Sequence, residues 1–257
     1  MSWALTSTGN NAGSTGQIGS CQLKAAATNG SLLSVWVSGS YVGSSTPSGD
    51  VSLSDGHNSW VSPIVSYWEN YYSNQWTYMA CFQVQNVSAT QLTISINYSG
   101  QNVSMTGTVI YIDEFTGISG SGSFVDGTPN IAWIKEMTTG SQTVLGIAIT
   151  EASGDLISTF IYDTDYWSVA ISALAASSGW TIAQNGLTNP GAVSGTAYQV
   201  SSSGSVTPSW NPTFTGTPGT YGDWVGVGGA AFKPTGTGSG GMNQVQEACW
   251  WRNPCLI

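Results

Sequence analysis

The side chains best suited to acid–base chemistry are few in this chain. His57 is its single histidine, and histidine is the side chain whose ordinary pKa lies closest to neutrality. It stands two residues after Asp55 in a glycine-containing turn, and no Gly-x-Ser-x-Gly sequence marks a serine that it could activate. A turn histidine beside Asp55 explains this pattern better than a catalytic triad does.

Acidic residues form two groups, and neither has the spacing of a catalytic or metal site. Asp113 and Glu114 are adjacent in a predicted strand, so they point to opposite faces and cannot act as a facing acid–base pair. We expect one of them to receive backbone or Tyr hydrogen bonds, because a buried carboxylate must be paired. Asp155, Asp163 and Asp165 offer oxygen ligands for calcium, but the spacing of a calcium loop is absent, which favours a solvated acidic turn.

Residues 236–241 (GTGSGG) match the glycine spacing of dinucleotide-binding turns. Such a turn needs a strand before it and a helix directly after it. Here the glycines stand in a tail rich in Gly, Thr and Ser, and a linker is the better interpretation. Together, these residues predict a protein that is not an enzyme, with no catalytic residue, no metal and no cofactor.

The four cysteines of the chain form no Cys-x-x-Cys pair, and a zinc site is disfavoured because the chain has one histidine. Cys249 and Cys255 are close together near the end of the chain, where a local disulfide would fit in an oxidising medium. Free buried thiols fit equally well. Cys21 and Cys81 allow other pairings, and the sequence does not choose among them.

Aromatic residues gather around a predicted loop over residues 70–74. Exposed aromatic rings next to Asn and Glu are typical of sugar-binding surfaces, because the ring face stacks on the C–H groups of a pyranose. The candidate ligand-binding residues are therefore Trp68, Tyr71, Tyr72 and Trp76. The alternative is that these rings cap a β-sandwich or line an oligomer interface.

The ends of the chain supply a second group of apolar side chains. Residues 1–20 are rich in Ser, Gly, Thr and Asn but include Trp3 and Leu5, and the last residues include Trp250 and Trp251. We interpret these four as candidate assembly contacts, docked on a neighbouring subunit or, for the C-terminal pair, on the chain's own domain. A homo-oligomer is the expected state.

The low content of charged residues disfavours nucleic acid and anionic membranes as partners. Charged residues make up 7% of the 257 residues and the net charge is −9, whereas about a quarter of an average soluble domain is charged. Four scattered cations do not form a face for nucleic acid or for an anionic membrane surface. No apolar run approaches the roughly 20 residues of a membrane helix. The start of the chain lacks the charged and apolar regions of a secretory signal.

Hydrophobic alternation predicts an all-β fold, an antiparallel β-sandwich or jelly-roll-like domain with extended N- and C-terminal arms. The apolar run 109–112 predicts a central strand, with 224–232 as the best candidate to lie beside it. In residues 76–84 one face is predicted to belong to the core and the other, with Thr77, Met79, Cys81 and Gln83, to be open to solvent. No stretch predicts a long helix.

These elements suggest an N-terminal arm over residues 1–21, one sandwich domain over 22–234, and a Gly-rich linker with a Trp- and Cys-containing tail over 235–257. A Gly/Ser-rich stretch near residue 118 also offers a boundary between two sandwiches of roughly 100 residues each. We prefer the single domain because the motif pattern described next runs across that point.

Short motifs follow one another in a fixed order from residue 32 to residue 234. The first four are LLSVWVSG (32–39), SDGHNSW (54–60), LTISINYSG (92–100) and EFTG (114–117), and the last three are GWT (179–181), AYQVS (197–201) and WVGVGGAAFKP (224–234). Together they resemble a β-sandwich domain common in bacterial surface proteins and phage structural proteins, whose pattern includes SD-x-x-GN-x-W, E-[FY]-[ST]-G and W-x-x-V-x-x-A-F-K-P. The resemblance implies a binding or structural role and carries over no catalytic residue.

The leading hypothesis is a non-enzymatic structural protein on the outer surface of a particle, such as a head decoration, fibre or tail-surface subunit of a phage virion. Its partners would be other virion or surface-assembly subunits. The alternative is a carbohydrate-binding adhesin module, extracellular or on a cell surface, with a host-surface glycan as ligand.

Overall fold

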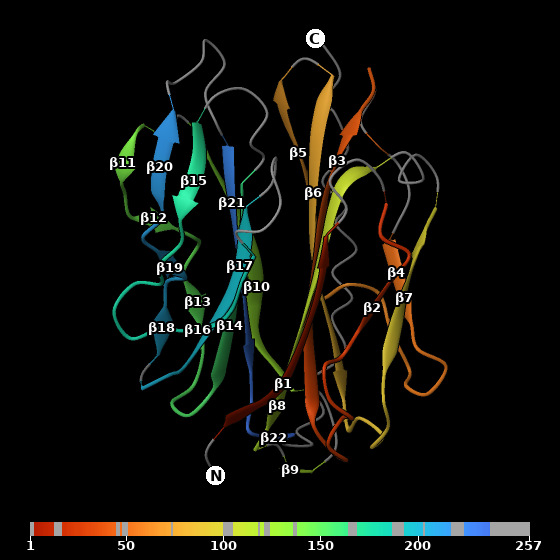
Figure 1. Ribbon diagram of the computed structural model, residues 1–257. Helices are drawn as coiled ribbons and strands as arrows, with labels where there is room; N and C mark the ends of the chain where they lie inside the picture. Colours follow the sequence, from red (N-terminus) through yellow and green to blue (C-terminus); the bar gives the residue numbers. More distant parts are fainter. Residues whose placement is uncertain are drawn as a thin grey trace, which may run out of the picture.

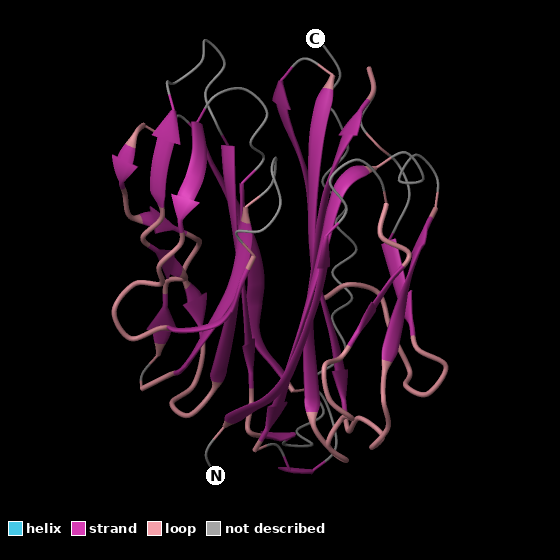
Figure 2. Cartoon of the chain, in the orientation of Figure 1, coloured by secondary structure: helices cyan, strands magenta, loops and turns pink. Residues whose placement is uncertain are grey.

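The computed structural model describes residues 3–12, 17–44, 47, 51–72, 74–99, 105–117, 119–120, 124–135, 138–163, 169–186, 193–202, 204–216 and 224–236. Within these ranges the regular elements are all β-strands, as Figure 2 shows. The all-β sandwich class predicted from hydrophobic alternation is therefore confirmed. Among the same residues, no helix is long and apolar enough to cross a membrane.

The first half of the chain forms an eight-stranded unit of two sheets. Five strands form one sheet in the order β1-β8-β3-β6-β5, and three short ones form the other in the order β2-β7-β4. First and last strands are neighbours and the chain alternates between sheets except at the β5–β6 hairpin, which is close to the arrangement of a jelly roll. The strands are β1 (Ala4–Ala12), β2 (Ser20–Gln22), β3 (Leu32–Val42), β4 (Val51–Ser54), β5 (Val65–Tyr72), β6 (Gln75–Gln85), β7 (Thr93–Tyr98) and β8 (Thr106–Thr116).

The second half repeats this topology. Its five-stranded sheet has the order β10-β21-β14-β17-β16, built from β10 (Val125–Lys135), β14 (Leu156–Asp163), β16 (Thr181–Asn185), β17 (Ser194–Val200) and β21 (Trp224–Phe232). The long connections after β10 and after β17 pair with each other as three short ladders, just as β2 pairs with β7. Their strands are β11 (Gly140–Ser141), β12 (Val144–Leu145), β13 (Ile149–Thr150), β18 (Ser205–Val206), β19 (Ser209–Trp210) and β20 (Thr213–Gly216).

Three further strands remain, one that completes the second half and two that join the two halves. β15 (Val169–Ala173) pairs with β20, as β4 pairs with β7 in the first half. β9 (Ser119–Gly120) and β22 (Thr235–Gly236) follow the last strand of each half and pair in parallel with each other. The structure therefore contains two successive jelly rolls that meet between β8 and β10, near the Gly/Ser-rich stretch, instead of the single sandwich predicted over residues 22–234.

The two five-stranded sheets face each other. The β2-β7-β4 sheet lies outside one of them and the short ladders of the second half lie outside the other, so that the molecule has four layers (Figure 1). Across the central space β3 lies over β14, β8 over β17 and β6 over β21, while at the edges β5 lies over β10 and β1 over β16. Strand order is thus reversed between the facing sheets. A twofold relation about an axis along β3 and β14 produces this reversal, so the two halves are arranged like the subunits of a symmetric dimer.

Equivalent residues meet where β3 crosses β14. The hydroxyl oxygens of Ser34 and Ser158 are 3.0 Å apart, and the rings of Trp36 and Phe160 stack with centroids 5.6 Å apart. The two segments also match in sequence, since LLSVWV begins β3 and LISTFI begins β14. This match identifies β3 and β14 as the same element of a duplicated fold.

Hydrophobic clusters fill the spaces between the four layers, and the central strands of each five-stranded sheet, such as β3 and β14, are buried on both faces. On β6, Tyr78 and Phe82 face the outer sheet of their own half, whereas Met79 and Cys81 face the second half. The face of residues 77–83 predicted to be solvated is therefore mostly buried, because a second sheet covers it. Gly226 and Gly228 of β21 leave room for Met79 and Trp36 at this interface.

The structure also corrects two expectations about strand neighbours. Residues 4–12, predicted to belong to an N-terminal arm, form edge strand β1 beside β8. Trp3 is buried and its indole nitrogen donates to the Gly154 carbonyl at 3.0 Å, while Leu5 packs half-buried on the central core. Strand β21 does not lie beside β8 but belongs to the facing sheet. Backbone pairing with β8 explains how so polar a segment as β1 enters the fold.

Candidate functional site

The aromatic candidates lie on the hairpin of β5 and β6, which replaces most of the loop predicted over residues 70–74. Trp68 pairs with Tyr78 across the hairpin, and their ring centroids are 4.9 Å apart. Tyr41 of β3 meets the edge of Trp68 at 6.4 Å. Trp76 is half-buried, and its indole nitrogen donates to the Gly43 carbonyl at 3.1 Å. The structure therefore brings Trp68 and Trp76 together on one face.

The other two aromatic candidates are placed only in part. Tyr71 and Tyr72 belong to β5, but their side chains lie outside the described part of the structure. On the opposite face of β5, Tyr67 is 49% exposed and stands beside Glu69. Partial burial raises the pKa of the Glu69 carboxyl, although a hydrogen bond from Tyr67 opposes the shift. An exposed ring beside a carboxylate is a further polar–aromatic pair at this hairpin.

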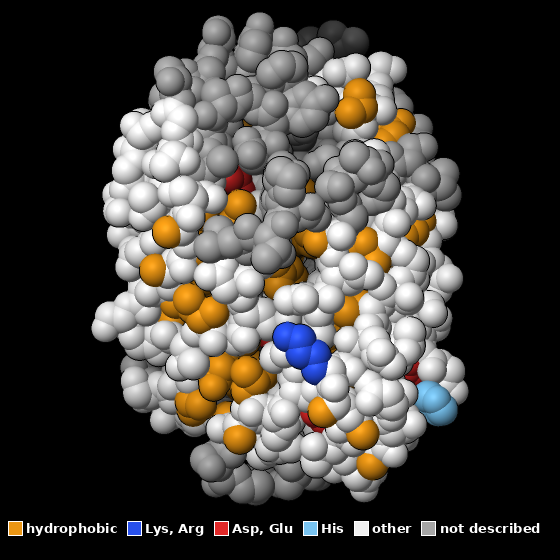
Figure 3. Space-filling view, viewed as in Figure 1, with side chains coloured by type: hydrophobic (Ala, Val, Ile, Leu, Met, Phe, Trp, Pro, Cys, Tyr) orange, Lys and Arg blue, Asp and Glu red, His pale blue; other side chains and the backbone are white. Residues whose placement is uncertain are grey.

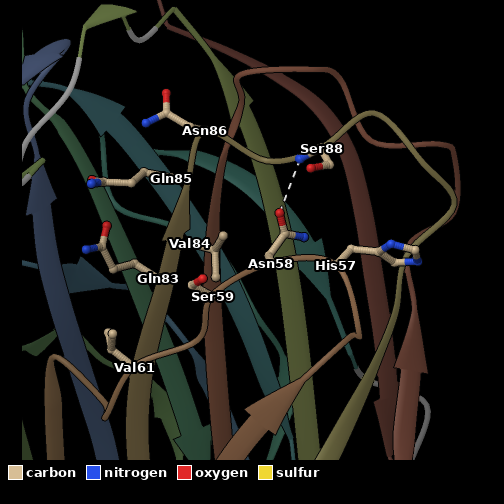
Figure 4. A pocket seen from close by; sticks show the side chains of 9 residues that line it. All are labelled: His57, Asn58, Ser59, Val61, Gln83, Val84, Gln85, Asn86 and Ser88. Carbon is tan, nitrogen blue, oxygen red and sulfur yellow. Dashed lines mark hydrogen bonds between the residues drawn. The ribbon is translucent and has the colours of Figure 1, made fainter.

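A separate depression opens at the far end of β6, where the loop between β4 and β5 meets that strand. It has a volume of about 400 Å³, and Figure 4 shows the side chains around it. Loop residues supply one wall and the end of β6 with the following turn supplies the other; the lining residues are His57, Asn58, Ser59, Val61, Gln83, Val84, Gln85, Asn86 and Ser88.

Asp55 organises the loop wall of this pocket. One carboxylate oxygen accepts the backbone N–H groups of His57 (2.9 Å) and Asn58 (2.7 Å), and the other accepts the Asn58 side-chain amide (2.7 Å). Burial disfavours the charged form, but these bonds outweigh it and hold the pKa of Asp55 below its usual value. The Asn58 side-chain oxygen, Oδ1, accepts the Ser88 backbone N–H at 3.2 Å and ties the two walls together. The SDGHNSW motif thus builds a fixed turn.

The adjacent acids Asp113 and Glu114 point to opposite faces of β8, as predicted. Glu114 accepts the backbone N–H of Thr28 at 2.5 Å and the Ser31 hydroxyl at 2.8 Å within the first half. Asp113 faces the second half and accepts the Gln184 side-chain amide at 2.7 Å. Burial raises the pKa of Asp113 to about 6, despite that hydrogen bond. Both carboxylates hold layers together.

The acids considered for calcium are also structural. Asp163 is fully buried and accepts the Ile171 N–H at 3.1 Å, and buried Asp155 accepts the Ala152 N–H at 2.9 Å. A solvated acidic turn is therefore wrong for these two, because both cap loops inside the fold; Asp165 lies outside the described residues. Desolvation raises the pKa of Asp155 to about 6, and nearby Asp126 adds to the shift. In the described ranges no group of three or more His, Cys, Asp or Glu side chains is placed to hold a metal ion.

Two of the four cysteines lie in the described part of the structure. Cys21 and Cys81 are free and buried, and burial raises the pKa of the Cys21 thiol to about 12 and that of Cys81 further. The proposed Cys249–Cys255 disulfide lies outside the described residues. So do Trp250, Trp251 and all of the GTGSGG sequence after Gly236.

Few charges interrupt the described surface, as Figure 3 shows for one face. Lys233 pairs with Asp126 at 3.0 Å, and the Lys135 ammonium lies 5.4 Å from the centre of the Trp224 ring. Two of the four basic residues of the chain thus interact with side chains of the same chain. Comparison with known proteins gave no match to a family model, a curated protein or a solved structure.

Proposed function

We propose that this chain is a non-enzymatic structural protein on the outer surface of a particle, most simply a phage virion, where it serves as a head decoration, fibre or tail-surface subunit. The observation that carries the proposal is a tandem jelly roll in which four buried carboxylates, those of Asp113, Glu114, Asp155 and Asp163, bind backbone or neighbouring polar groups. Jelly rolls are common in viral capsid and lectin domains, although a fold alone does not define a function.

Uncharged polar surface supports the same proposal. Short Ser, Thr and Asn side chains bind water and lose little rotamer entropy when they are ordered, which suits a surface exposed to a medium outside the cell. Trp250 and Trp251 remain proposed assembly contacts in a homo-oligomer or with other subunits. Trp3 does not, because it is buried in the chain's own central core, against which Leu5 packs half-buried.

Mass spectrometry of density-purified particles from the source culture tests this proposal. The expected result is that the chain co-purifies with particles at a fixed, high copy number and stays bound through a second gradient in high salt. A chain found free or cell-bound, and absent from particles, would contradict it. A host protein of similar abundance provides the control for carry-over.

A second candidate function, a carbohydrate-binding adhesin module, is favoured by the aromatic hairpin. Trp68 and Trp76 share a face and are both half-buried, so part of each ring stays accessible for stacking. Under this proposal Trp68→Ala and Tyr72→Ala abolish binding on a glycan array, whereas the neighbouring exposed Val42→Ala does not. Absence of binding to any host glycan would remove this candidate.

A further inference from the structure

We propose that the pocket between the Asp55 turn and the end of β6 binds a neutral saccharide. This site lies at the opposite end of β6 from the aromatic hairpin, since Gln83 and Gln85 line the pocket whereas Trp76 is the second residue of the strand. The proposal holds whether or not the chain is part of a particle.

The pocket exists because β5 begins late. Val65 is the first residue of β5 and pairs with Cys81, so no described strand covers the last residues of β6 on that side. The preceding loop, held by Asp55 and anchored by the half-buried Trp60, stands across the gap instead. A preformed wall on each side lowers the ordering entropy that a bound ligand would otherwise cost.

Apart from His57, the lining has no ionisable side chain, and it is rich in groups that donate and accept hydrogen bonds. The amides of Asn58, Gln83, Gln85 and Asn86 and the hydroxyls of Ser59 and Ser88 surround the pocket, and Figure 4 shows them on its two walls. An amide side chain carries an acceptor oxygen and two donor protons. Asn58 and Gln85 already use their oxygens for the N–H groups of Ser88 and Phe124, so these two offer donor protons to a ligand, whereas Gln83 also offers its oxygen. Adjacent sugar hydroxyls also donate and accept, so this lining suits them.

The same lining disfavours charged ligands. The lining contains no lysine, arginine or carboxylate side chain. Asp55, the nearest acid of the turn, directs both carboxylate oxygens at loop donors. A phosphate, a sialic acid or an amine would lose its hydration in this pocket without gaining an opposite charge.

The volume of the pocket and an unsatisfied acceptor in its wall also fit a sugar. A volume of about 400 Å³ lies within the range of small-ligand pockets and suits one or two sugar rings. The Gln83 side-chain oxygen is buried and has no hydrogen-bond partner among the described residues, so a ligand hydroxyl would relieve an unsatisfied acceptor. Val61 is 61% exposed at one end of the pocket and offers apolar surface to the C–H face of a ring.

Calorimetric titration of the full chain with a panel of neutral mono- and oligosaccharides tests the proposal. Gln83→Met removes the amide at nearly constant volume, and Asn86→Gly preserves the left-handed backbone of Asn86, whose φ is 57°. Each variant is expected to weaken binding roughly tenfold, the effect of losing one hydrogen bond. Gln22→Met, an exposed glutamine in β2, is the matched control and should bind as the parent does.

Three results would overturn the proposal. The first is that no neutral saccharide binds at millimolar concentration. The second is that binding survives Gln83→Met and Asn86→Gly but is lost in Trp68→Ala, which assigns the sugar to the aromatic hairpin. The third is that extended peptides bind the end of β6 and sugars do not compete, which identifies strand addition instead. Retained cooperative unfolding of each variant shows that a loss of binding is local.

Discussion

At the scale of single residues, the most informative side chain is a carboxylate that faces the joint between the two halves. Asp113 of β8 binds Gln184 of β16. Tyr111, two residues earlier on the same face of β8, binds Ser194 of β17 through its hydroxyl at 2.9 Å. Tyr111 and Cys81 are the neighbouring titratable groups, and burial raises the pKa of both far above neutrality. Asp113 is therefore the group of this joint that titrates between pH 4 and 7.

Asp113→Asn should stabilise the protein at neutral pH. The folded-state pKa of about 6 exceeds the ordinary value of 3.8, so the folded state binds this proton more tightly than the unfolded state. Its stabilising effect is complete below about pH 4 and is lost as pH rises through 6. Asparagine keeps the acceptor for Gln184 without the charge, and the free energy of unfolding at pH 7 should rise by about 3 kcal/mol.

Urea unfolding of both proteins at pH 4 and pH 7 checks this expectation. The difference should vanish at pH 4, which serves as the internal control. Part of the pH dependence should remain in the variant, because Asp155 also has a pKa of about 6. Equal stability of the two proteins at pH 7 would contradict the burial of a charged Asp113.

Gly228 of β21 lies against side chains of the first half, where a larger residue would not fit. A Cβ atom on Gly228 would lie 2.4 Å from the Trp36 ring and 3.2 Å from the Met79 sulfur. Because Trp36 is fully buried, Gly228→Ala should cost about 1–3 kcal/mol of stability. Gly19→Ala, whose Cβ meets nothing within 4 Å, is the control, and thermal unfolding measures both. Equal melting temperatures would refute the close packing of β21 on β3.

At the scale of elements, the sequence predicts strands well where their side chains alternate or form apolar runs. Strands β3, β6, β7, β8, β14 and β21 lie where hydrophobic patterns placed them. Prediction fails where backbone pairing decides instead. β1 (ALTSTGNNA) has few apolar side chains because it is an edge strand with mostly exposed positions, and the two-residue strands of the second half are too short for any periodicity.

The sequence predicts one wall of the candidate pocket but not the pocket itself. The turn around Asp55 followed from its Asp-Gly pair and is confirmed, whereas the pocket beside it depends on β5 starting only at Val65. That starting point is set by tertiary pairing, which local sequence does not encode. Burial of β6 on both faces was missed because Thr, Met and Cys look equally compatible with solvent. The match of LLSVWV with LISTFI was the available signal of duplication.

Strand β1 is expected to contribute to stability, as a flexible arm would not. Deletion of residues 1–12 removes β1, uncovers the edge of β8 and takes Trp3 from the central core. The truncated chain should therefore lose several kcal/mol of stability and lower its melting temperature by roughly 10 °C or more. Deletion of residues 242–257 is the comparison. An unchanged melting temperature after the N-terminal deletion would show that β1 is dispensable.

At the scale of the whole molecule, the two halves form a fused pseudo-symmetric dimer. Facing sheets meet in reversed order about β3 and β14, and side chains from both halves share one central core. A linked pair avoids the concentration dependence of a true dimer, because the second half is always present at high effective concentration. This arrangement leaves the outer layers and sheet edges as the surfaces available to partners.

The measurement that tests this arrangement most directly is a cross-link at its axis. The Ser34 and Ser158 hydroxyl oxygens are 3.0 Å apart although 124 residues separate them, so cysteines at these two positions would bring their sulfurs into contact. We predict that the double variant Ser34→Cys/Ser158→Cys, made with Cys81→Ser to remove the neighbouring thiol, forms this cross-link under a mild oxidant. Peptide mass spectrometry should find it in the double variant and in neither single variant. If both introduced thiols are instead alkylated when the oxidised protein is unfolded, the halves do not meet face to face along β3 and β14.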